Sequence, residues 1–220
     1  MAAIGQHARA RAEMELARTY DPHSMIISVW KGIVLRLASD YENAIQACLQ
    51  ATQRDPEYVL AHWALGLAYE AAGYLELASA EFETAEVLSG GSPPGMLSAL
   101  AYNRAIQGDD QRATELLEHL HALSAKRYVA AYDLATVYVG LRDDEGALKY
   151  LDKASQERSP WIVALSVEPR MQRLICNVYF QSLLRRLRLP LIDAPCAPKT
   201  ESVNGDRPPA SSASQHAPLK

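Results

Sequence analysis

Apolar side chains recur at helical spacing through residues 58–88. Leu60, Trp63 and Leu67 fall on one face of a helix expected over 58–72, and a second helix is expected over about 75–88. Gly73 lies between them, where a helix ends best on a residue that tolerates positive φ. The second helix carries its apolar stripe on four residues, Leu75, Ala78, Phe82 and Ala85. The pattern therefore predicts a helical hairpin.

The same pattern recurs along the chain. Matching positions return about every 34 residues, as in Ala44, Ala78, Ala113 and Ala147. Such a period is typical of repeat proteins, in which each unit buries its apolar face against the next. The period divides the chain into four units, 25–58, 59–92, 94–127 and 128–161. Small residues such as Gly66 allow the two helices of a unit to approach closely, and Phe82 fills the space beside them.

These residues resemble the motif of the tetratricopeptide repeat (TPR) family. The motif places Leu-Gly-x-x-Tyr in the first helix, small and bulky residues in the second, and a closing Pro. The resemblance covers about residues 8–161 and implies an all-α fold, a right-handed α-solenoid of stacked helix-turn-helix hairpins with a C-terminal capping helix. The matching residues include Leu65, Gly66, Tyr69, Gly73, Ala78, Phe82, Ala85, Gly32, Tyr41, Pro56, Leu100, Gly108, Leu134, Tyr138 and Ala154.

Both ends depart from the full repeat. Residues 1–24 hold a helix, about 8–19, in the phase of a second helix whose first helix is missing; it either caps the array or marks the end of a longer protein. Residues 162–189 are expected to form capping helices, with one short helix at 160–165 and another at about 176–188, after the Ser159-Pro160 start. Residues 190–220 are rich in Pro, Ala and Ser and are expected to be a disordered tail.

The ending is similar to that of one group of bacterial TPR proteins. The stretches SPWIVAL, Glu168-Pro169-Arg170 and FQSLLRRL follow in the order seen there, although the group's usual Asp-Pro-Arg-Phe repeats are altered. In that group the repeats commonly follow a signalling domain, such as a winged-helix DNA-binding domain, a kinase or a nucleotide cyclase. The resemblance therefore implies an alternative function, the regulatory or sensor part of a bacterial signalling or transcription-regulator protein whose effector domain is absent from this chain.

The TPR resemblance implies that the first helix of each unit lines a concave partner-binding face. Here that face is apolar and aromatic, without the Lys, Arg and Asn set of carboxylate-clamp members. Its occupant would be a protein or peptide segment, or else a neighbouring part of a longer chain or a second copy, so self-association stays open. The predicted binding residues are Val29, Ile33, Arg36, Trp63, Leu67, Glu70, Tyr102, Tyr132 and Thr136.

Composition and charge exclude several further classes of function. A net charge of −4 argues against direct nucleic-acid binding, which needs a basic surface. Three cysteines at unrelated spacings indicate neither a disulfide framework nor a zinc site. The N-terminal stretch contains no apolar signal segment, and no apolar run is long enough to span a membrane. A cytoplasmic location fits best.

Catalytic motifs are absent from the sequence. GGSPPG at 90–95 lacks the Lys of a phosphate-binding loop, and no GxSxG elbow occurs. His119 and His121 are two apart on a helix, so they point away from each other and are not expected to share a metal. We therefore expect no cofactor, no metal and no enzyme, and we interpret the chain as a non-enzymatic scaffold for protein–protein interaction.

Overall fold

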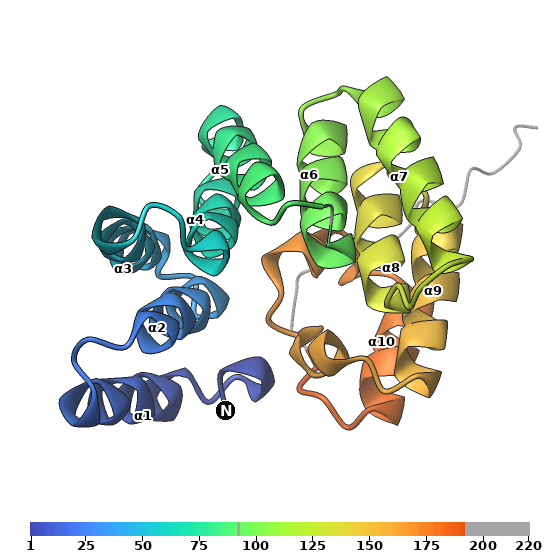
Figure 1. The fold of residues 1–220 in the computed structure, drawn as a ribbon. Coiled ribbons are helices and arrows are strands. Elements are labelled where there is room, and N and C mark those ends of the chain that lie inside the picture. Colours follow the sequence, from blue (N-terminus) through green and yellow to red (C-terminus); the bar gives the residue numbers. More distant parts are fainter. Residues whose placement is uncertain (92, 192–220) are drawn as a thin grey trace, which may run out of the picture.

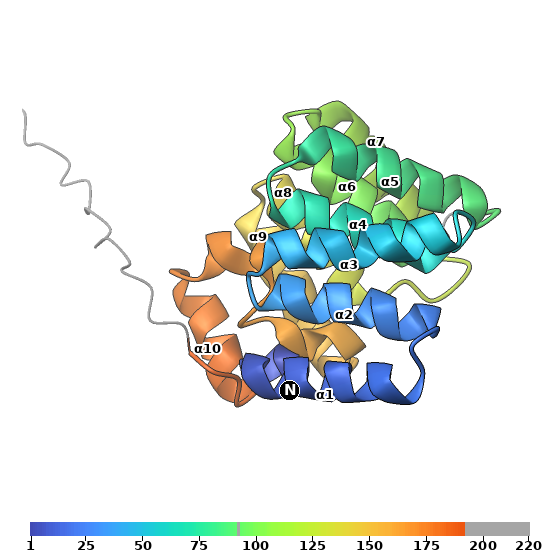
Figure 2. The same ribbon diagram turned by 90° about the vertical axis from the view of Figure 1, so that its left-hand side faces the viewer.

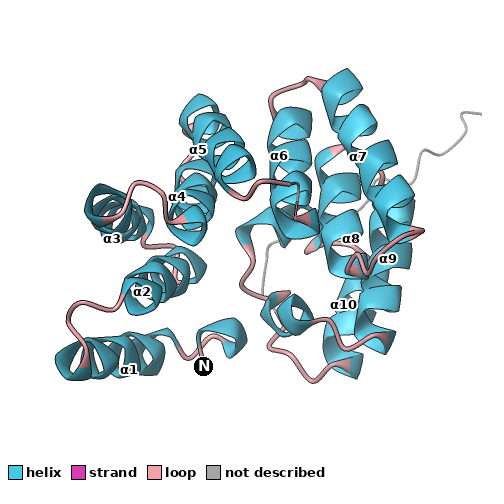
Figure 3. Cartoon of the chain, viewed as in Figure 1, coloured by secondary structure: helices cyan, strands magenta, loops and turns pink. Residues whose placement is uncertain are grey.

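The computed structural model describes residues 1–91 and 93–191, and helices account for every regular element in these ranges (Figure 3). A short 3-10 turn, η1, opens the chain. Two 3-10 helices, η2 and η3, and one α-helix, α10, form the C-terminal end of the described chain. The bounds are η1 Ala2–Ile4, α1 His7–Tyr20, α2 Met25–Leu37, α3 Tyr41–Arg54, α4 Val59–Ala71, α5 Leu75–Leu88, α6 Pro94–Ile106, α7 Asp110–Ser124, α8 Ala131–Gly140, α9 Asp144–Gln156, η2 Pro160–Ala164, η3 Pro169–Leu174 and α10 Val178–Arg186.

The helices pair as antiparallel hairpins that stack on one another. α2 packs on α3, α4 on α5, α6 on α7 and α8 on α9, and each first helix also contacts the hairpin before it (Figures 1 and 2). α1 packs against α2 without a full first helix of its own. The predicted fold class, an all-α solenoid of stacked helical hairpins with a C-terminal capping helix, is confirmed.

One turn geometry joins the two helices of every hairpin. The turn residue has positive φ at Ser39, Gly73, Gly108 and Arg142, which occupy equivalent positions of the four units. The next N–H reaches back to a carbonyl five positions earlier, as in Tyr74 N to Tyr69 O at 2.9 Å, which is the 6→1 bond of a Schellman motif. Gly5, one repeat length before Ser39, has the same φ sign and the same bond, Gln6 N to Met1 O at 3.0 Å. The repeat geometry thus extends back to the turn before α1.

Close approach inside the hairpins explains the small residues of the motif. A methyl group added at Gly66 would lie 2.5 Å from the ring of Phe82, and one at Gly32 would lie 2.2 Å from Sγ of Cys48. Phe82 and Cys48 are fully buried. Because the second-helix side chain sits directly on the first-helix glycine, neither position tolerates a larger residue without separating the helices.

The C-terminal end differs from the expected cap. The helix expected at 160–165 is the short 3-10 turn η2, the helix expected at about 176–188 is α10, and η3 lies between them without having been predicted. Pro160 and Pro169 stand at the start of η2 and η3, where a missing N–H costs nothing. The predicted disordered tail at 190–220 lies outside the described residues from 192 onward.

Candidate functional site: a groove filled by the chain itself

The nine predicted binding residues all lie on first helices of the hairpins. Val29, Ile33 and Arg36 are on α2; Trp63, Leu67 and Glu70 on α4; Tyr102 on α6; Tyr132 and Thr136 on α8. All are buried except Trp63 and Tyr102, which are partly buried. The predicted binding face is therefore largely covered and does not face solvent.

Residues 160–175, here called the C-terminal segment, cover this surface. In Figure 1 the segment runs between the α2 and α4 side and the α6 and α8 side of the solenoid. It contacts α2, α4, α6 and α8 through the side chains described below. Its two short 3-10 helices, η2 and η3, do not form a further helical hairpin of the array, so the groove is occupied by an irregular stretch of the same chain.

Two ion pairs join the C-terminal segment to α2 and α4. Nη1 and Nη2 of Arg36 donate to the two carboxylate oxygens of Glu168 at 2.7 and 2.6 Å. Nε and Nη2 of Arg170 donate to the two carboxylate oxygens of Glu70 at 2.6 and 3.0 Å. The residues, which we call the four-charge cluster, are only 2%, 4%, 9% and 7% exposed in the order Arg36, Glu168, Arg170, Glu70. Parallel bonds of this kind are the strongest form of carboxylate recognition by arginine.

The charges of the four-charge cluster shift one another's pKa values. Burial acts to raise the pKa of Glu168, but the charges of Arg36 and Arg170 and their hydrogen bonds outweigh burial and lower it. Burial raises the pKa of Glu70, against the opposing effect of Arg170, and Glu168 adds to the rise. The pKa of Arg36 is raised because Glu168 outweighs the burial that would lower it. Each charge thus depends on its partner, since a buried ion without one is costly.

Aromatic rings add a second set of contacts. The indole of Trp161 stacks on Trp30 with ring centroids 6.0 Å apart at 25°, and meets Trp63 at 6.1 Å and 55°. These are all three tryptophans of the chain. The guanidinium of Arg170 lies 4.7 Å from the ring centre of Tyr102, within the range of a cation–π contact. Intrinsic fluorescence therefore reports on the docking of the C-terminal segment.

The other side of the segment is apolar. Ile162, Leu165, Met171 and Leu174 are buried in one cluster with residues of α8, α9 and α10. Toward α2 and α4 the segment packs partly buried Trp161 and Val167, and Pro160 and Val163 border an open groove beside α2. The segment is therefore fixed to the C-terminal hairpin by its hydrophobic side chains and to α2 and α4 mainly by charges and an indole.

A small cavity of about 50 Å³ remains between the segment and the groove. Its lining includes Asp133, Arg36 and Trp63, and buried Nε1 of Trp63 and Nε of Arg36 have no hydrogen-bond partner within residues 1–91 and 93–191. The space could hold a few water molecules that satisfy them. Burial raises the pKa of Asp133 to about 6, partly offset by Arg170.

Arg36 and Glu70 were among the predicted groove residues, whereas Trp161, Glu168 and Arg170 were not. Arg36 and Glu70 stand one repeat apart, at the same position of neighbouring units, opposite in charge on otherwise apolar helices. Each therefore needs an opposite charge close by. Glu168-Pro169-Arg170 supplies both, and this complementarity was the available indication.

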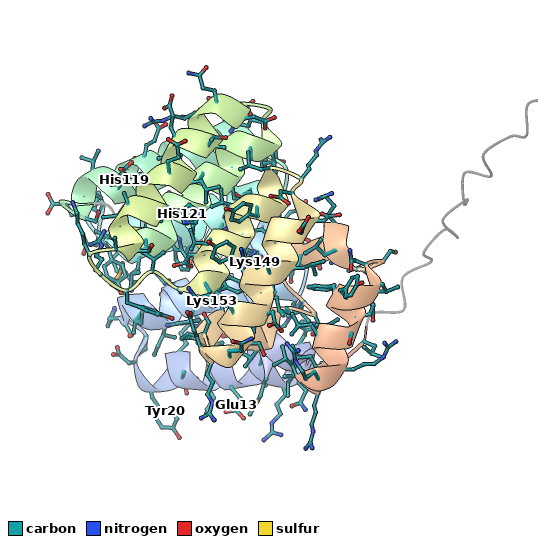
Figure 4. The ribbon with its side chains drawn as sticks, turned by 90° about the vertical axis from the view of Figure 1, so that its right-hand side faces the viewer. Glu13, Tyr20, His119, His121, Lys149 and Lys153 are labelled. Carbon is teal, nitrogen blue, oxygen red and sulfur yellow. The ribbon has the colours of Figure 1, made fainter. Side chains whose placement is uncertain are left out.

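The histidines and lysines of the outer helices lie away from the groove. His119 and His121 lie on α7, and Lys149 and Lys153 lie on α9 (Figure 4). Nε2 of His121 lies 3.2 Å from the hydroxyl of Tyr138. No group of three or more His, Cys, Asp or Glu that could hold a metal occurs in the described part of the chain. No helix within residues 1–91 and 93–191 is long and apolar enough to cross a membrane.

Cys48 lies in the core of the first full repeat. Cys48 is a free thiol on the bulky core position of its repeat, and burial raises its pKa to about 12. It is therefore an inert core residue at neutral pH, as expected for a buried cysteine.

Comparisons with known proteins agree with the repeat architecture. A family model for the TPR repeat matches residues 32–73. No curated protein sequence matches the chain. Among solved structures it is similar to a thermophilic TPR protein of Thermus thermophilus, with 21% identity over 83% of this chain and 93% of that one and a TM-score of 0.59. A tetratricopeptide repeat protein from Parabacteroides merdae is also similar, with 12% identity over 84% and 73% of the two chains and a TM-score of 0.48.

Proposed function

We propose that the chain is a non-enzymatic TPR scaffold that binds a protein or peptide segment in its concave groove, and that the C-terminal segment holds this groove closed. The observation that carries the proposal is the segment itself. A stretch of chain with two short 3-10 helices lies in the groove and is held there through its side chains. A surface that accommodates such a stretch within the chain has the shape and chemistry to accommodate one from a partner.

The segment's contacts with α2 and α4 differ from its contacts with the C-terminal hairpin, and this difference supports a groove that opens on one side. Separating α2 and α4 from the segment breaks two ion pairs and the tryptophan contacts, while Ile162, Leu165, Met171 and Leu174 keep their burial on the C-terminal hairpin. Opening along the charged side therefore exposes much less apolar surface than undocking the whole segment would. In this account the nine predicted residues are the binding residues of the open form.

The proposal is tested with full-length protein in which the closure is weakened, Glu168→Gln with Arg170→Gln. A displayed library of random peptides is selected against this variant, and binding of the enriched peptides is measured by fluorescence anisotropy. We expect affinities at least tenfold higher for the variant than for the wild type, and loss of binding when Trp63→Ala is added. Val87→Ala, on the exposed face of α5, is the matched control.

The proposal fails if no peptide is enriched, or if the enriched peptides bind the wild type equally well and are insensitive to Trp63→Ala. Either result would remove the groove from the function. A cytoplasmic location and self-association remain predictions.

A regulatory part of a signalling protein is the second candidate. It is favoured by an open apolar groove of about 790 Å³ at the N-terminal end of the array, where Met14, Trp30 and Val34 meet Pro160 and Val163. Such a surface could seat a further domain. The coding sequence upstream of Met1 tests this candidate: an in-frame effector domain would support it, and an in-frame stop codon directly before Met1 would contradict it.

A further inference from the structure

Two charged residues of the groove restrict what can bind there. Arg36 and Glu70 occupy equivalent positions on α2 and α4, and both are buried while the C-terminal segment is in place. When the C-terminal segment parts from these helices, both charges lose the partner that offsets their desolvation. A ligand that covers α2 and α4 in place of the segment would remove both charges from water again. Because burying either charge without a partner is strongly unfavourable, such a ligand has to bring a carboxylate for Arg36 and a cation for Glu70.

The geometry also selects the kind of cation. Arg170 donates two bonds to Glu70 from different nitrogens and places its guanidinium plane over Tyr102. Lysine has one ammonium group, which cannot form the same two-nitrogen fork or stack through a planar group. The groove is therefore suited to arginine at this position. The carboxylate facing Arg36 is likewise held by two parallel bonds.

The third contact of the segment with α2 and α4 is made by the indole ring of Trp161. Trp161 stands seven positions before Glu168 in the sequence and lies against Trp30 and Trp63, one on α2 and one on α4. A ligand that reproduces the three contacts needs an aromatic residue, then an acidic residue seven positions later, then arginine two positions after that. Pro169 lies between the charged residues and fixes the start of the turn from which Glu168 reaches α2 and Arg170 reaches the neighbouring α4.

We propose, on the basis of the function proposed above, that the partner of this groove is a protein segment carrying an acidic residue and an arginine two positions apart, preceded by an aromatic anchor. The C-terminal segment is a built-in copy of that recognition sequence. It occupies Arg36, Glu70 and the tryptophan site until a partner segment of the same chemistry replaces it on α2 and α4.

The test uses a labelled peptide of residues 159–175 and the full-length Glu168→Gln, Arg170→Gln variant. Two altered peptides are compared with it, one with the charges exchanged (Glu168→Arg with Arg170→Glu) and one with Arg170→Lys. We expect the native peptide to bind the variant, the exchanged peptide to bind at least tenfold more weakly, and the lysine peptide about fivefold more weakly. Adding Arg36→Glu and Glu70→Arg to the protein should reverse the preference between the native and exchanged peptides.

A second variant keeps the test valid if the Glu168→Gln, Arg170→Gln variant does not fold. Trp161→Ala in the full chain keeps the four charged residues and removes an indole that packs against both the α2 and α4 side and the α8 and α9 side. The same three peptides are titrated against it. Circular dichroism melting establishes that each protein used is folded. The order of the three affinities is expected to be the same for both proteins.

The outcomes separate this inference from the proposed function. Equal binding of native and exchanged peptides, or enriched library peptides without an acidic residue and arginine two apart, would overturn the recognition sequence and leave groove binding standing. Failure of every peptide, library or native, would overturn both. Light scattering that shows the variant to be a dimer, with the groove closed to all three peptides, would assign the site to the segment of a second copy and overturn the inference of a separate partner.

Discussion

The two sides of the C-terminal segment hold it in place by different physical means. The side facing α8, α9 and α10 is a continuous hydrophobic contact formed by buried Ile162, Leu165, Met171 and Leu174. The side facing α2 and α4 relies on the four-charge cluster and the tryptophans. Hydrophobic burial is non-directional and tolerates small shifts, whereas forked ion pairs require one geometry. The first side fixes the segment to the fold, and the second decides whether the groove is closed.

The largest expected effect comes from breaking one buried pair. Glu168→Ala leaves Arg36 buried without its carboxylate and should lower the free energy of unfolding by about 3–5 kcal/mol. Urea denaturation followed by circular dichroism measures it. Glu115→Ala is the control, because Glu115 pairs with Arg112 on the exposed surface of α7 and its loss should leave stability unchanged. Equal effects of the two substitutions would show that the cluster is solvated in solution.

The apolar side is tested by Leu174→Ala. Leu174 is fully buried, so the substitution should lower the free energy of unfolding by about 2–5 kcal/mol through lost burial and the cavity left behind. Val163→Ala, in the neighbouring turn and about half exposed, should cost less than about 0.5 kcal/mol. Unlike Glu168→Ala, Leu174→Ala should not promote peptide binding. Increased peptide binding by Leu174→Ala would erase the distinction between the two sides.

Asp133 makes the closed groove sensitive to pH. Burial raises its pKa from 3.8 to about 6, so between about pH 4 and 6 the folded protein binds more protons at this residue than the unfolded chain. Its contribution to stability therefore falls as the pH rises through this window and is unfavourable above it. Asp133→Asn should raise the free energy of unfolding at pH 7 by about 1–3 kcal/mol and flatten its dependence between pH 4 and 6. Parallel pH profiles for wild type and variant would contradict this assignment.

The smallest effect is expected at the ring stack. Trp30→Leu removes the stacked partner of Trp161 from a site that is already 42% exposed, and should cost about 0.5–1.5 kcal/mol. The tryptophan emission spectrum should change at the same time, because the two remaining indoles lie on the same contact. Tyr20→Leu, on the largely exposed end of α1 (Figure 4), is the matched control and should change neither.

Local signals were sufficient for the hairpins. The regular repeat interval placed the helices, and the predicted helix at 75–88 coincides with α5. Gly73 has the positive φ that its position required, and Phe82 lies on Gly66 as the size pattern indicated. These features follow from contacts between residues less than one repeat apart. These features can therefore be predicted from the periodic pattern of the sequence alone.

The position of the C-terminal segment in the groove could not be predicted from the periodic pattern. Glu70 and Arg170 are 100 residues apart, and Arg36 and Glu168 are 132 apart, so no local pattern links them. Ser159-Pro160 correctly indicated the start of a turn, but turn chemistry does not say on which side of the array the chain continues. Charge complementarity between the two repeats and Glu168-Pro169-Arg170 was present, but only the fold brings the residues together.

A double-mutant cycle on Glu70 and Arg170 tests the central claim most directly. Unfolding free energies are measured for Glu70→Gln, Arg170→Gln and the double variant. If the segment occupies the groove as described, the double variant loses little more than the larger single loss, which gives a coupling energy of at least about 1.5 kcal/mol. Losses that add to within about 0.5 kcal/mol would mean that the two residues do not touch in solution and that the groove is not closed by this segment.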